Sequence, residues 1–132
     1  MAKVEGQYFL KDKKAQVYKK VSVPNPGGKP LNKWYPISDD LLWCYAKQLS
    51  QDETFYAKTY GDAENRFFVF NHNKLIAFND YVLYRGTWYM ITRVDTTEDY
   101  NTDVFVYVKN ATGGNIPSQS NVEDYDPDIF ND

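Results

Sequence analysis

The fold is decided by residues 79–94, Asn-Asp-Tyr-Val-Leu-Tyr-Arg-Gly-Thr-Trp-Tyr-Met-Ile-Thr-Arg-Val. Aromatic and β-branched residues fill both halves of this stretch, and such residues favour strands over helices. Gly86 supplies the backbone freedom that a tight turn needs. We therefore predict two short antiparallel strands, residues 81–84 and 87–94, joined at Arg85-Gly86.

The rest of the chain has the composition of a mostly-β protein. Its 132 residues suffice for one domain with a real core, and 17% of them are aromatic, including twelve Tyr. Further strands are expected at residues 16–23, 33–37, 54–60, 66–70 and 103–109. Five to seven short antiparallel strands with close turns predict a small β-barrel or sandwich.

One helix is expected between the early strands. Ser38 can serve as its N-cap, and Asp39 and Asp40 in the first turn would favour the helix dipole. The helix would extend to residues 50–52. Its apolar stripe at i, i+3, i+4 and i+7 consists of Leu42, Tyr45, Ala46 and Leu49.

The chain divides into a central domain and two arms. We expect an N-terminal arm at residues 1–14, a β-barrel domain at 15–109 and a flexible acidic tail at 110–132. Residues 24–30, with three Pro and two Gly, form an exposed loop. No stretch is long and apolar enough for a membrane span, and residues 1–6 have no apolar core, so no secretory signal is expected.

Charge is distributed unevenly along the chain. Residues 1–35 carry a net +6, residues 36–109 a net −4 and residues 110–132 a net −5. This pattern is either an accident of a solvated surface or a means for copies or partner proteins to meet by opposite charge.

No residue pattern predicts catalysis. His72 is the one histidine and lies in an Asn-rich turn, whereas Cys44 lies within the expected helix. Residues 95–103 resemble a calcium loop but lack the glycine at the sixth place. We expect no enzyme, no catalytic residue, no cofactor and no metal site.

A single-stranded nucleic-acid-binding module of the oligonucleotide-binding type is the alternative class. Aromatic side chains interleaved with Lys on a small barrel can stack bases, and the candidates are Tyr8, Phe9, Tyr18, Lys19, Lys20, Trp34 and Tyr35. A pI of about 5.1 argues against a general nucleic-acid binder. A carbohydrate-binding module is also conceivable, and the missing secretion signal counts against it.

Four parts of the sequence resemble the head-closure (head–tail connector, or stopper) proteins of long-tailed bacteriophages. They are the early strand with its long turn at residues 16–30, Trp34-Tyr35-Pro36-Ile37-Ser38-Asp39-Asp40 running into Ala46-Lys47-Gln48-Leu49, the strand at 54–60, and the hairpin with Ile76, Asp80, Val82, Tyr84-Arg85-Gly86, Tyr89 and Ile91. The resemblance covers residues 15–109, and residues 62–73 and the tail depart from it.

The resemblance implies a virion protein of the phage neck, assembled in the host cytoplasm. Such a protein forms a homo-oligomeric ring that closes the DNA-filled head, joins portal and adaptor to tail proteins, and surrounds packaged double-stranded DNA without sequence specificity. The arms would order across neighbours on assembly, and the Ser38–Glu53 segment or the 24–30 loop would face the channel. Candidate channel or interface residues are Lys19, Lys20, Lys29, Asp39, Asp40, Lys47, Arg85, Asp124 and Asp126.

Overall fold

The computed structural model describes residues 10–48, 66–71, 73, 75–96, 103–113 and 116–130. These residues form seven strands and one short 3-10 helix. The strands are β1 (Lys13–Val23), β2 (Leu31–Pro36), β3 (Leu42–Gln48), β4 (Arg66–Asn71), β5 (Tyr81–Tyr84), β6 (Thr87–Thr96) and β7 (Asp103–Asn110). The 3-10 helix η2 spans Gln119–Asn121. The prediction of a mostly-β protein is confirmed.

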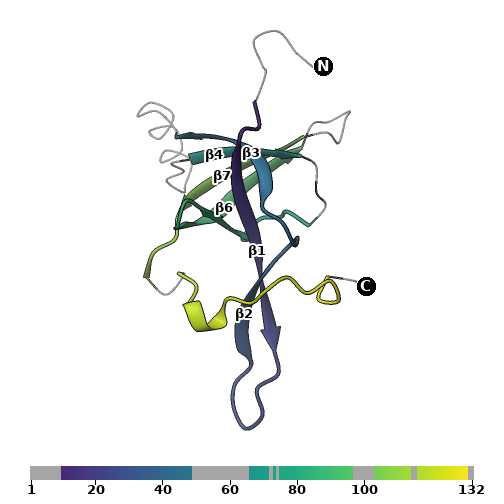
Figure 1. Cartoon of the computed structure of the whole chain (residues 1–132). Coiled ribbons are helices and arrows are strands. Elements are labelled where there is room, and N and C mark those ends of the chain that lie inside the picture. Colours follow the sequence, from purple (N-terminus) through teal and green to yellow (C-terminus); the bar gives the residue numbers. More distant parts are fainter. Residues whose placement is uncertain are drawn as a thin grey trace.

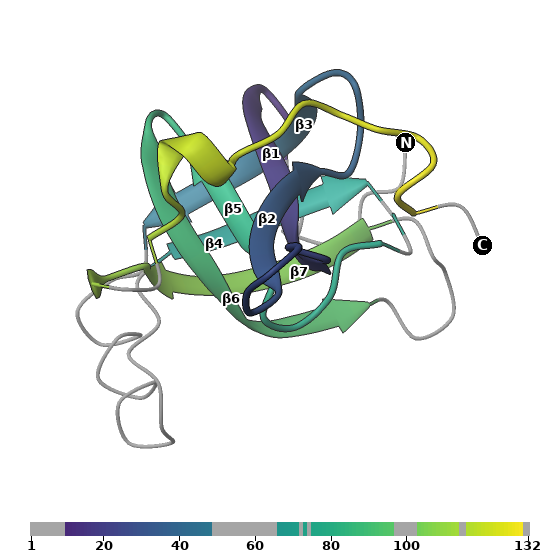
Figure 2. The same cartoon turned by 90° about the horizontal axis from the view of Figure 1, so that it is seen from below.

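Six of the strands close into an antiparallel barrel. The sheet order β2-β1-β3-β4-β7-β6-β5 is closed by a further pairing of β1 with β5. Figure 2 shows these strands wrapping around a common interior. Closure removes free strand edges, so the barrel is complete without β2. Of the two architectures that the sequence allowed, the chain therefore adopts the barrel.

The predicted β5–β6 hairpin is confirmed. Tyr81 pairs with Met90 and Tyr84 with Thr87, so the two-residue turn is Arg85-Gly86. Both turn residues have positive φ, 50° at Arg85 and 79° at Gly86. Positive φ at both positions defines the turn type whose twist matches that of paired strands.

Aromatic rings and valines fill the barrel. Val104, Val106 and Val108 alternate along β7 and point inward with at most 1% of their surface exposed. The ring of Phe68 packs on Phe70 and meets the edge of Tyr84 at 5.2 Å between centroids. The predicted strand at residues 103–109, with its valines on one face, is thus correct.

The prediction of a helix beginning at Ser38 is wrong. Residues Leu42–Gln48 form strand β3, which pairs with β1 and β4. The inward side of β3 carries Cys44, which is fully buried, with Leu42 and Ala46 packed against the core. The period of two competes here with the helical period, and the strand pairings on both sides of β3 decide between them.

The residues expected to cap that helix form a bulge in a long antiparallel pairing. Ala15 pairs with Leu42 and Tyr18 pairs with Pro36, so three steps along β1 correspond to six along its partner. The extra residues turn outward between β2 and β3. The Gln16 side chain, only 4% exposed, fills the gap by donating from Nε2 to the carbonyl oxygens of Ser38 at 3.2 Å and Asp40 at 3.0 Å.

Strand β2 and the second half of β1 form a two-stranded hairpin, here called the arm (residues 18–36), that projects from the barrel. Tyr18 through Val23 pair with β2, whereas only residues 16–18 of β1 also pair with β5. Figure 1 shows the arm extending below the barrel, with the C-terminal segment crossing it near its base. The outcome is a closed barrel with one appendage.

Candidate interaction surfaces

The arm presents a cationic surface. Residues 13–36 contain six Lys and no acidic residue. Lys20 and Lys29 are exposed, the first on β1 and the second in the loop at the tip. Two predicted interface residues are therefore accessible on the same appendage. Because the tip is rich in Pro and Gly, the loop adopts its own turn, in which Gly28 N donates to Asn25 O at 3.1 Å and Gly27 has a φ of 78°.

Lys19, by contrast, has an intramolecular role. Its Nζ donates to Asp80 Oδ2 at 2.7 Å and to Leu75 O at 2.8 Å. The same Asp80 oxygen accepts the backbone N–H of Ala77 at 2.9 Å. These bonds fasten the loop before β5 to the barrel. Burial raises the pKa of Asp80, although the Lys19 ammonium and the Ala77 N–H act in the opposite direction.

The remaining candidates on the barrel are scattered. Asp39 and Asp40 are exposed in the bulge between β2 and β3, and Lys47 is exposed near the end of β3. Arg85 is exposed in the β5–β6 turn, with its guanidinium 5.1 Å from the centroid of the Tyr84 ring. The structure does not join these four residues into one surface with the arm.

Asp124 and Asp126 lie in the C-terminal segment, residues 116–130, here called the strap. The strap contains four acidic residues and no basic one. Burial, and secondly the charge of Asp124, raises the pKa of Tyr18 at the base of the arm. The sequence therefore placed basic and acidic candidates at opposite ends of the chain, and the fold brings some of them side by side.

The contact that joins the strap to the arm was missed. Lys33 Nζ lies 3.1 Å from Glu123 Oε2, and neither residue was among the candidates. The backbone N–H of Glu123 donates to Trp34 O at 2.9 Å, and Val122 forms a parallel bridge with Trp34. The charge difference between the two ends of the chain was the available signal, but it gave no register.

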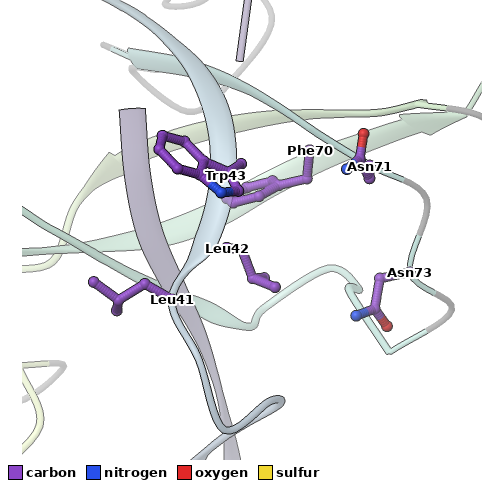
Figure 3. Close-up of a pocket in the computed structure, with 6 residues that line it drawn as sticks. All are labelled: Leu41, Leu42, Trp43, Phe70, Asn71 and Asn73. Carbon is purple, nitrogen blue, oxygen red and sulfur yellow. The ribbon is translucent and has the colours of Figure 1, made fainter. Parts of the chain in front are cut away.

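A hollow of about 220 Å³ opens beside the start of β3. It is lined by Leu41, Leu42, Trp43, Phe70, Asn71 and Asn73 (Figure 3). Leu41 and Trp43 are 55% and 52% exposed, and the Lys14 ammonium lies 4.4 Å from the centre of the Trp43 ring. Reading this region as a helix hid the hollow, because only a strand turns Trp43 to the face opposite Cys44.

A second aromatic layer lies on the outside of the barrel. Phe67 stacks obliquely on Tyr107 at 4.8 Å and meets Phe105 at 5.9 Å, and the Arg93 guanidinium lies 3.9 Å from the Tyr107 ring. Val69, on the same side of β4, is fully buried. Many aromatic residues thus stabilise the barrel from outside as well as inside.

The residues considered for chemistry contribute no reactive site in the described part of the chain. Burial raises the pKa of the Cys44 thiol to about 12. His72 lies outside the described residues. Among residues 10–48, 66–71, 75–96 and the later described segments, no group of three or more His, Cys, Asp or Glu side chains could hold a metal ion. None of the helices described is long and apolar enough to span a membrane.

The fold and its surfaces define a small antiparallel β-barrel protein with an exposed arm. Neither the known protein families nor the curated proteins include a match to the sequence. The fold is similar to the solution structure of protein SF1141 from Shigella flexneri 2a, with a TM-score of 0.63 and 11% sequence identity. The alignment covers 76% of this chain and 92% of that one. At this identity the likeness shows the fold alone.

Proposed function

We propose that this protein is a structural component of a bacteriophage neck, where copies form a ring that closes the filled head and joins portal and adaptor to the tail. The observation that carries the proposal is the β5–β6 hairpin, whose Asp80, Tyr84-Arg85-Gly86, Tyr89 and Ile91 resemble the hairpin of head-closure proteins. In this fold Tyr84, Tyr89 and Ile91 are core residues, and Asp80 fastens the preceding loop. The bulge at residues 38–40 stands where the resemblance implies a helix start, so that part lends no support.

The shape of the molecule supports a role in assembly. A ring of identical subunits needs two different surfaces on each copy, one meeting the other on its neighbour. The exposed arm with Lys20 and Lys29 provides one such surface, and the acidic residues Asp39 and Asp40 on the barrel provide another. In this proposal residues 1–14 and 110–132 are arms that become ordered on neighbours, and the 24–30 tip or the 38–53 segment faces the DNA channel.

Reconstitution with neck proteins tests the proposal. The purified chain is mixed with a portal–adaptor complex from the phage or prophage that encodes it, and the particles are sized by native mass spectrometry and imaged by electron microscopy. We expect a ring of defined copy number on the complex. A chain that stays monomeric and does not bind the complex would refute the neck function. The chain alone is no substitute in this test, because such rings can require a template.

Single-stranded nucleic-acid binding is the second candidate, favoured by one specific surface. Trp43 is half exposed beside the Lys14 ammonium, an arrangement that suits base stacking next to a phosphate. Titration with an oligothymidylate, followed by Trp fluorescence at increasing salt, tests it. Trp43→Ala should abolish binding, and affinity should fall steeply with salt if phosphate contacts contribute. Salt-independent or undetectable binding would exclude this function.

A further inference from the structure

The strap occupies a strand edge that the barrel does not need. β2 lies outside the closed barrel and pairs with β1 alone among the described strands. Its other edge takes up the strap through the Trp34–Val122 bridge and the bond from Glu123 N to Trp34 O. Strand edges with unpaired backbone groups bind extended segments by adding a strand. The outer edge of β2 is therefore a peptide-binding site that the chain's own strap fills.

The chemistry of this site is specific for an acidic segment. The bridge aligns Val122 with Trp34, and the Lys33 ammonium lies 3.1 Å from the Glu123 carboxylate. The arm side offers Lys residues without any acid, whereas the strap offers four acidic residues without any base. Beyond this contact, Phe130 packs partly buried against the barrel core and forms a second anchor. Both anchors involve side chains that every copy of the chain carries.

We propose that the strap exchanges between copies: the strap of one molecule binds the β2 edge and the Phe130 seat of a second molecule. The exchanged contact repeats the same atoms, so it costs little beyond the loss of the intramolecular one. Residues 111–122 connect the end of β7 to the bridge, and eleven residues can span up to about 36 Å when extended. This reach allows the strap to cross to an adjoining barrel. The inference concerns copies of this chain and holds whether or not they assemble in a phage neck.

Mass action sets the concentrations at which exchange is visible. A short connection gives the intramolecular strap an effective concentration on the order of 1 mM. The exchanged form should therefore be about 1% of the total at about 10 µM protein, and it should approach the unexchanged form at about 1 mM. The ratio should rise in proportion to protein concentration.

Isotope mixing with carbodiimide coupling measures the exchange in the full chain. Equal amounts of ¹⁵N-labelled and unlabelled protein are mixed at about 10 µM and about 1 mM and then treated with a zero-length carbodiimide, which joins a carboxylate to an amine in contact. The Lys33–Glu123 cross-linked peptide is then analysed by mass spectrometry. We expect only same-label peptide at the low concentration, and about a quarter of the peptide to be mixed-label at the high one, because half of the exchanged contacts join unlike copies.

Two controls isolate the specific contact. Glu123→Gln removes the carboxylate and should eliminate this cross-link at both concentrations. Cross-links from the exposed Lys29 to any carboxylate report random collisions, and mixed-label Lys33–Glu123 peptide must exceed their yield per site severalfold. A Lys33–Glu123 cross-link that remains same-label at about 1 mM, or exceeds collision background by nothing, would overturn the exchange. Ring formation on a portal–adaptor complex is scored separately, so failure of the neck function would leave this result standing.

Discussion

The barrel and the arm share strand β1, yet the two halves of that strand are stabilised in different ways. In the barrel half, Ala15 and Val17 are at most 1% exposed and pair with strands on both sides. In the arm half, Lys20 and Ser22 are exposed and β2 is the one strand partner described. A two-stranded hairpin alone is marginally stable in water. The arm therefore depends on what binds its edges, while the barrel depends on its own core.

This difference separates folding from assembly within one small chain. The closed barrel can tolerate changes on the arm, because the arm contributes few buried side chains to its core. Variants in the barrel should accordingly alter global stability, and variants in the arm or strap should alter local opening and association. The following predictions test that division in order of decreasing effect.

Cys44 reports how tightly the barrel is closed. Raising the pKa from its ordinary 9.0 to about 12 leaves roughly a thousandth of the thiolate at neutral pH, and the thiolate is the reactive form. We expect native Cys44 to react with a disulfide reagent about a thousandfold more slowly than in denaturant. Rapid labelling of the native protein would show that this end of the barrel opens readily.

Phe68→Ala should produce the largest change in stability. The Phe68 ring is fully buried among Phe70, Tyr84 and Tyr89, and its removal leaves a cavity. The free energy of unfolding should fall by about 3–5 kcal/mol, measured by urea denaturation. Val21→Ala, at a half-buried position on the arm, is the matched comparison and should cost below about 1 kcal/mol. Equal losses would contradict the division into barrel and arm.

Gln16→Ala tests the bulge that replaces the expected helix. The variant deprives the carbonyl oxygens of Ser38 and Asp40 of a donor in a nearly buried setting. We expect a loss of about 2–3 kcal/mol in the free energy of unfolding. Lys14→Ala, two positions away with an exposed side chain, serves as the control and should change it by below about 0.5 kcal/mol. An unaffected Gln16→Ala variant would mean that the bulge carbonyls have other partners.

Asp80→Asn removes the charge that faces Lys19. Because Lys19 keeps a quarter of its side chain exposed, water can solvate it, and the expected cost is about 1–2 kcal/mol. The pH dependence has a definite sign. Burial raises the pKa of folded Asp80 above its ordinary 3.8, so its contribution to stability is full below that value and declines as pH rises through the folded pKa.

Urea titrations of both proteins at a series of pH values measure this effect. The stability of the wild type relative to Asp80→Asn should be greatest below pH 3.8, fall as the pH rises, and level off above the folded pKa. A difference that grows with rising pH would mean that the Lys19 ammonium outweighs burial.

The sequence predicted those elements whose local signals agree with their tertiary setting. In the β5–β6 hairpin, strand-forming residues flank Arg85-Gly86, and the turn requires what this pair supplies. In β7, valines at alternate positions match the barrel wall. Local propensity and burial favour the same structure in both, so one sequence sufficed for the correct assignment.

The errors arose where local and long-range signals conflict. Ser38-Asp39-Asp40 carries the side chains of a helix cap, but Ser38 Oγ donates to Asp40 O at 2.7 Å within a bulge. The bulge depends on Gln16, twenty-two residues away, which no local pattern reveals. The pairing of Lys33 with Glu123 spans ninety residues and is equally invisible in the sequence. Of the candidate residues, the exposed Lys20 and Lys29 were found by charge, whereas the Trp43 hollow required knowledge of the strand.

Glu123→Gln should have the smallest effect and gives the finest test of the division. The Lys33–Glu123 pair is about one-third exposed, and such pairs contribute about 0.2–1 kcal/mol. Amide exchange of Glu123, whose N–H donates to Trp34 O, should accelerate up to about fivefold, while the global free energy of unfolding stays within about 0.5 kcal/mol. Asp128→Asn, an exposed strap position, should leave this exchange rate unchanged. If Glu123→Gln instead lowered global stability by several kcal/mol, the strap would belong to the cooperative unit of the barrel, and its release to a second copy would cost as much as unfolding.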